Sequence, residues 1–216
     1  MTPVLKFLKA IFSKIFPFAK PKLHYFALGD STVEGIGATS PAKGYVGQLV
    51  NFLAKDFRVS VTNLGKKGAA TFDVMENQLP HLLGHKPQLV TISVGPNDIR
   101  KLRRTSEFYN NLQVILGFLS ATGANVVINT IPDMSRLPAI PKVARWLVRK
   151  RVEQFNNVIW NLAALYNVTV CDLFEKSKQF EARKEYIAND GFHLSNTGYH
   201  LWASFLHAKV KPLLVK

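Results

Sequence analysis

The chain has 216 residues, 47% of them hydrophobic, and carries 28 Lys and Arg against 14 Asp and Glu, for a formal net charge of +14. This length and composition indicate one globular domain with a substantial core. A single cysteine excludes an internal disulfide and any metal site built from several cysteines. The positive charge favours anionic partners such as nucleic acid, anionic lipid or acidic substrates, without choosing among them.

Residues 1–21 predict a basic amphipathic helix in front of a domain that occupies residues 22–216. This helix is too short and too rich in lysine to span a bilayer, and no small-residue cleavage site of a secretory signal follows it. Two interpretations stay open. The helix lies in an anionic membrane surface, with the protein peripheral to the cytoplasmic side, or it packs across the domain itself.

From residue 23 onward, strand-like runs alternate with longer amphipathic stretches. The runs are rich in Val, Ile and Thr and are bounded by turn residues, which predicts strands at 23–29, 58–65, 88–95, 124–131 and 167–173. Between these runs, apolar residues recur at the spacing of a helix, which predicts helices at 44–57, 72–83, 107–122, 142–166 and 196–211. This repeated order predicts a mostly parallel sheet with helices on both faces.

The first three strands each end in residues suited to chemistry. Gly-Asp-Ser at 29–31 follows the first strand, Asn-Leu-Gly at 63–65 with Gly68 close behind ends the second, and Gly-Pro-Asn-Asp at 95–98 follows the third. In a parallel sheet these ends lie along one edge, where open α/β sheets bind their ligands. Taken alone, Ser31 is more typical of a helix N-cap.

A fourth group lies near the C-terminus, where Asp190 precedes His193 by three residues. A serine hydroxyl becomes a nucleophile when a histidine accepts its proton and a carboxylate orients that histidine, so Ser31, His193 and Asp190 match the needs of acyl transfer. The oxyanion of the intermediate needs preorganised donors, for which the N–H groups of Ser31 and Gly65 and the amide of Asn97 are candidates.

These four blocks, "GDST", Gly65, "GPND" and "DGFHLS", resemble those of the SGNH hydrolases, also called the GDSL lipase/esterase family. The resemblance extends from about Leu23 to Leu214. It implies a three-layer α/β/α fold of the flavodoxin-like kind, with a mostly parallel five-stranded sheet. It also implies hydrolysis of carboxylic esters or thioesters without a metal or organic cofactor. Thr32 replaces the usual Leu of the first block, which bears on the shape of the pocket.

Basic and apolar residues follow the third and fourth strands, on the same rim as the proposed site. We expect Arg100, Arg136, Arg145 and Trp146 to border the substrate, although solvated helix faces would show the same pattern. Together with the N-terminal helix, these residues favour an ester or acyl-lipid substrate at an anionic surface.

Other functions are less well supported. A carbohydrate O-deacetylase of the same family is the main alternative, since it would need only a small acyl pocket. A basic nucleic-acid- or membrane-binding module without catalysis is the alternative from a different class, although the basic residues lack the interleaved aromatic residues of nucleic-acid binding. His81 and His85 lack the glutamate of an H-E-x-x-H metal motif, so we interpret them as surface histidines. Cys171 lies in an apolar run and is interpreted as a core residue.

Overall fold

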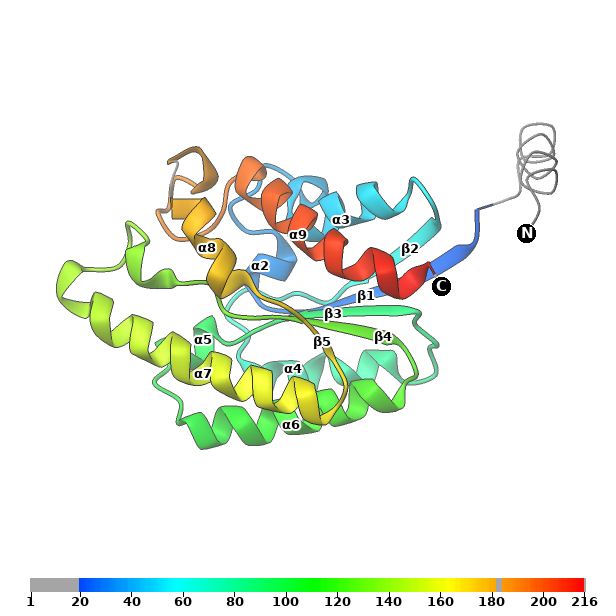
Figure 1. Ribbon diagram of the computed structural model, residues 1–216, viewed down its shortest axis with the longest axis horizontal. Coiled ribbons are helices and arrows are strands. Elements are labelled where there is room, and N and C mark those ends of the chain that lie inside the picture. Colours follow the sequence, from blue (N-terminus) through cyan, green and yellow to red (C-terminus); the bar gives the residue numbers. More distant parts are fainter. Residues whose placement is uncertain (1–19, 182–183, 216) are drawn as a thin grey trace, which may run out of the picture.

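A computed structural model describes residues 20–181 and 184–215 of the chain. The helix predicted for residues 1–21 falls almost entirely outside these described residues. Figure 1 shows one sheet between two layers of helices, as predicted. Its strands are β1 (Lys22–Gly29), β2 (Arg58–Asn63), β3 (Leu89–Ser93), β4 (Asn125–Asn129) and β5 (Thr169–Cys171). They pair in the order β2-β1-β3-β4-β5, and every pairing is parallel. The fold prediction is confirmed.

The two core layers follow from the alternation of side chains along the strands. On β1, Phe26 and Leu28 face one core cluster, whereas Tyr25 and Ala27 face the other. The first cluster is covered by α4 (Thr71–Asn77), α6 (Thr105–Ala121) and α7 (Arg145–Leu165), and the second by α3 (Tyr45–Leu53) and α9 (Asn196–Leu214). Because apolar side chains on both faces are buried, the central strands are continuously hydrophobic, as is typical of a parallel sheet.

The helix boundaries differ from the sequence prediction at two places, where a 3₁₀ turn replaces part of the expected α-helix. The helix expected over 72–83 ends at Asn77 and continues as a 3₁₀ turn (Leu79–Leu82), because Pro80 cannot donate to an α-helical hydrogen bond. The helix expected from 142 begins with a 3₁₀ turn (Lys142–Ala144) before α7. Further 3₁₀ turns occupy Pro41–Lys43, Met134–Arg136 and Lys184–Tyr186.

Three helices that the sequence analysis did not predict complete the fold. Helix α8 (Leu173–Glu181) follows β5 in a short polar stretch that the sequence analysis did not assign to a helix. Helices α2 (Ser31–Glu34) and α5 (Pro96–Arg100) directly follow β1 and β3. They bring Ser31 and Asn97 to the carboxyl edge of the sheet. Within the described ranges, no helix combines the length and the apolar composition that a bilayer crossing requires.

Candidate active site

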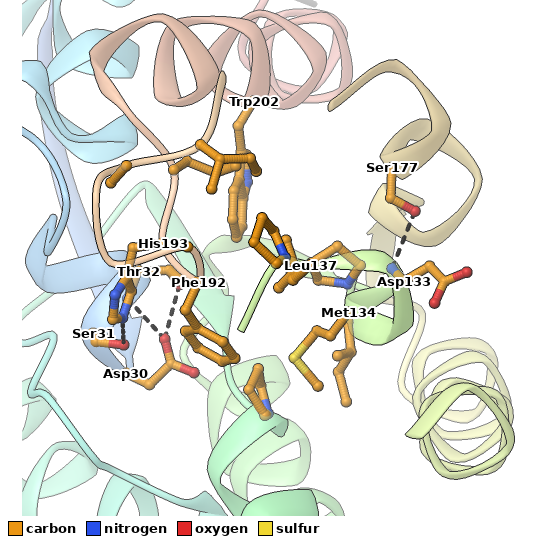
Figure 2. Close-up of a pocket in the computed structure, with 18 of the residues that line it drawn as sticks. Asp30, Ser31, Thr32, Asp133, Met134, Leu137, Ser177, Phe192, His193 and Trp202 are labelled. Carbon is orange, nitrogen blue, oxygen red and sulfur yellow. Dashed lines mark hydrogen bonds between the residues drawn. The ribbon is translucent and has the colours of Figure 1, made fainter. Parts of the chain in front are cut away.

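Ser31, His193 and Asp190 form a continuous hydrogen-bonded series at the carboxyl edge of the sheet. The Ser31 Oγ lies 3.0 Å from His193 Nε2, and His193 Nδ1 lies 2.5 Å from Asp190 Oδ2. Figure 2 shows the imidazole of His193 beside the Ser31 hydroxyl. The three side chains come together across 162 residues of sequence separation, because the loop before α9 folds back over the end of β1.

A sharp turn between β1 and α2 presents Ser31. Gly29 has a φ of +139°, and a Cβ on it would lie 1.8 Å from the Ser93 carbonyl oxygen, so only glycine fits there. Asp30 then caps α2, since its Oδ1 accepts hydrogen bonds from the N–H and the hydroxyl of Thr32 at 2.9 and 2.8 Å. Ser31 opens the helix, and no described residue accepts a hydrogen bond from its N–H.

The carboxylate of Asp190 organises the loop that carries His193. Its Oδ1 accepts the N–H groups of Phe192 and His193, both at 2.9 Å, while Oδ2 binds the imidazole. Burial alone would raise the pKa of Asp190, but these hydrogen bonds outweigh it and lower the pKa to about 2. The carboxylate is therefore ionised at neutral pH and holds the proton of the imidazole on Nδ1, which leaves Nε2 as the acceptor for Ser31.

Asn97 lies in the first turn of α5, with its amide beside the loop that follows β2. One N–H of this amide donates to the Ala69 carbonyl at 3.0 Å. An amide has a second N–H. Asn97 and Ser31 both line the same cavity, so the second N–H is available to a ligand there.

The structure does not support the predicted role of Gly65. Its N–H donates to the Asn63 side chain at 2.9 Å, so this donor is already used. A Cβ at residue 65 would lie 2.4 Å from the Glu34 nitrogen, which shows that glycine is needed for close packing of this loop against α2. Gly68 has a φ of +83°, and its N–H has no hydrogen-bond acceptor in the part of the chain that the structure describes. Sequence alone could not distinguish the two glycines, because the difference lies in the path of the loop.

A cavity of about 610 Å³ opens beside Ser31 and His193. Figure 2 shows it extending past Phe192, Leu137 and Met134 toward Asp133 and Ser177. Its walls are mainly apolar, formed by Val94, Ile131, Pro132, Met134, Leu137, Pro138, Phe192, Leu194 and Trp202. The sequence pattern alone does not single out most of these wall residues. Trp202 in particular has the helical spacing of an ordinary core residue.

Of the four residues expected at the substrate rim, Arg136 lines the cavity and the other three do not. Arg100 is exposed at the end of α5, and Arg145 and Trp146 begin α7 beyond the cavity wall. The expectation for these three is therefore corrected, because the chain leaves the cavity at Pro138 before the basic helix begins. Among the described residues, no cluster of three or more His, Cys, Asp or Glu is arranged to hold a metal ion.

Comparison with known proteins agrees with this geometry. The model of the GDSL-like lipase/acylhydrolase family matches residues 27–201. The chain belongs to this family. The resemblance of the four motif blocks to this family is thus confirmed.

Individual GDSL-family relatives differ in how much of the chain they match. A GDSL-like esterase of Mycobacterium tuberculosis is 28% identical over 137 residues, which cover 60% of this chain and 42% of the relative. The chain thus spans less than half the length of that protein. The lipase/acylhydrolase of Enterococcus faecalis is 26% identical, with a TM-score of 0.71 over 88% of this chain and 96% of that one. An acetyl xylan esterase shares the fold, with a TM-score of 0.72 at 17% identity over 86% and 98% of the two chains.

Proposed function

We propose that this GDSL-family protein hydrolyses carboxylic esters or thioesters by transferring the acyl group to Ser31. The observation that carries this proposal is the hydrogen-bonded series from Asp190 through His193 to Ser31, at the mouth of an apolar cavity. This arrangement has the three parts that serine acyl transfer requires, a nucleophile, a base and a group that orients the base.

In the first half-reaction, His193 Nε2 accepts the proton of the Ser31 hydroxyl as Oγ bonds to the carbonyl carbon of the substrate. The N–H of Ser31, the second N–H of the Asn97 amide and the N–H of Gly68 stabilise the oxyanion of the tetrahedral intermediate. His193 then gives the proton to the departing alcohol or thiol as its bond to carbon breaks. In the second half-reaction, His193 activates water, which releases the acid and restores Ser31.

The cavity supports an acyl substrate of medium or long chain. Its volume of about 610 Å³ lies in the range of sites for small molecules, and its walls are mainly hydrocarbon. An acyl chain lying along Phe192, Leu137 and Met134 would bury apolar surface. Each Å² of apolar surface removed from water contributes about 25 cal/mol to the binding free energy. An acetyl group would leave most of this space unfilled. The fold shared with an acetyl xylan esterase keeps a carbohydrate deacetylase as the second candidate.

The test is hydrolysis of p-nitrophenyl esters from acetyl to palmitoyl by the wild type and by Ser31→Ala. We expect the wild type to prefer medium or long chains, and Ser31→Ala to lose at least about 10³-fold in kcat/KM, since the nucleophile is removed. A preference for acetyl alone would favour the deacetylase. Equal activity of the two proteins would refute the role of Ser31.

Leu137→Trp tests the acyl site separately. An indole at this position fills part of the cavity, so activity on long chains should fall by about tenfold or more while acetyl hydrolysis is retained. Leu165→Trp is the matched control, because Leu165 is exposed outside the cavity.

A further inference from the structure

Three large hydrophobic side chains are exposed together where α7 begins. Val143 is 95% exposed, Trp146 71% and Leu147 53%. Their spacing of three and four residues places them on one side of the chain as the 3₁₀ turn passes into α7. We refer to these three residues as the apolar tip. Such a cluster is unusual, since exposed apolar residues are normally scattered singly over the surface of a soluble protein.

The apolar tip lies within a stretch of uniformly positive charge. Residues 134–152 contain six Lys and Arg and no Asp or Glu. Lys142 and Lys150 are both exposed, and the Lys150 ammonium lies 5.2 Å from the centre of the Trp146 ring. Lysine and tryptophan side chains with this arrangement suit the interface of a bilayer, where the ring lies at headgroup level and the ammonium meets lipid phosphates.

The same segment forms part of the cavity wall. Met134, Leu137 and Pro138 line the cavity, and the apolar tip begins five residues after Pro138. The Ala139 N–H also donates to the Gly191 carbonyl at 3.2 Å, which ties the segment to the loop of His193. Figure 1 shows the connection between β4 and α7 projecting at the end of the molecule where the strands have their carboxyl ends, away from the start of β1.

We propose that the apolar tip docks this protein onto an anionic lipid bilayer, with Lys142 and Lys150 against the headgroups and the acyl-binding cavity facing the membrane. The charge favours anionic lipid, and the exposed aliphatic groups of Val143 and Leu147 require an apolar phase that a nucleic acid does not offer. This inference rests on the proposed function for the identity of the substrate, whereas the docking itself does not depend on hydrolysis.

The experiment uses the full chain with vesicles of phosphatidylcholine brominated on its acyl chains, alone or mixed with phosphatidylglycerol. Bromine quenches a tryptophan that enters the hydrocarbon boundary. We expect quenching with the anionic vesicles only, and its loss in Trp146→Phe. If wild type and Trp146→Phe are quenched equally, Trp146 does not enter the bilayer and the proposal is overturned.

Co-sedimentation with the same vesicles measures the contribution of the apolar tip. Substituting all three residues by Ser should lower the partition coefficient by roughly tenfold or more, because apolar contact with the bilayer is lost. Replacing Lys142 and Lys150 by Ser should lower it by roughly fivefold per charge. The matched control replaces three exposed apolar residues elsewhere, Val114, Trp160 and Leu165, and should bind like the wild type.

Hydrolysis of a short soluble ester separates this inference from the proposed function. The variant with three Ser substitutions should retain this activity, and Ser31→Ala should retain vesicle binding. Unchanged binding of the former variant would overturn the docking surface even if the wild type is an active esterase. Binding that depends on the apolar tip in a protein without esterase activity would instead support docking and refute the proposed function.

Discussion

The Arg149 Nη1 donates a hydrogen bond to Asp133 Oδ2 at 2.6 Å, which ties the first turns of α7 to the loop that lines the cavity. The Asp133 side chain is buried, and its Oδ1 also accepts the Ser135 N–H at 3.0 Å. Arg149 is only half-buried, lies over the Phe174 ring and donates through Nε to Glu153. This pair therefore holds the cavity wall and the start of α7 in one arrangement.

Arg149→Met should destabilise the protein by about 2–3 kcal/mol, because it leaves the buried carboxylate of Asp133 without its cation. Urea unfolding measures this change as a lower midpoint at an unchanged slope. Lys178→Met is the matched control, since it breaks only the exposed pair with Glu175 and should leave the urea midpoint almost unchanged. Equal costs for the two variants would contradict this view of the pair.

Asp190→Asn should lower kcat by about 10³–10⁴-fold while leaving the protein folded, because an amide no longer enforces the proton on His193 Nδ1. The Asp190 side chain is nearly half exposed, so we expect little change in melting temperature. Steady-state kinetics with a soluble ester and thermal unfolding of the same preparation provide the two measurements. Retained kcat with a lowered melting temperature would make Asp190 a structural residue.

Gly65→Ala should destabilise the fold by about 2 kcal/mol or more, because its Cβ would meet the backbone of Val33 and Glu34. Gly68→Ala meets no atom within 4 Å, and its positive φ costs only about 1 kcal/mol. We expect Gly68→Ala to reduce kcat more than stability, since the strain turns the backbone N–H away from the oxyanion. The reverse pattern, a stable Gly65→Ala with low kcat, would restore Gly65 as the donor.

Asp30→Asn should change how stability depends on pH. Burial raises the pKa of Asp30 from 3.8 to about 6, partly opposed by hydrogen bonds from Thr32. Because the pKa is higher in the folded state, the favourable contribution of the protonated carboxyl is complete below pH 4 and is lost as the pH rises to about 6.

Relative to the wild type, Asp30→Asn should therefore gain about 2 kcal/mol in free energy of unfolding between pH 4 and pH 7. Urea unfolding at the two pH values tests this, with the exposed Asp56→Asn as control. A difference between wild type and Asp30→Asn that stays constant with pH would show that the Asp30 carboxyl does not titrate in this range.

The sequence by itself determined the order of strands and helices, because hydrophobic period and turn residues are local properties. The runs at 23–29 and 124–131 needed no tertiary information to be identified as buried strands. It also indicated that Ser31, Asn97 and His193 would meet, since parallel strands bring their carboxyl ends to one edge. The spacing of three residues between Asp190 and His193 added Asp190 to the same group.

Only the tertiary structure decided which groups face the cavity. The use of the Gly65 N–H by the Asn63 side chain depends on how one loop packs against α2. The path of the chain after Pro138 separates Arg136, in the cavity wall, from Trp146, in the exposed tip. Both outcomes depend on contacts between segments far apart in sequence, and a local pattern of residue types carries no information about those contacts.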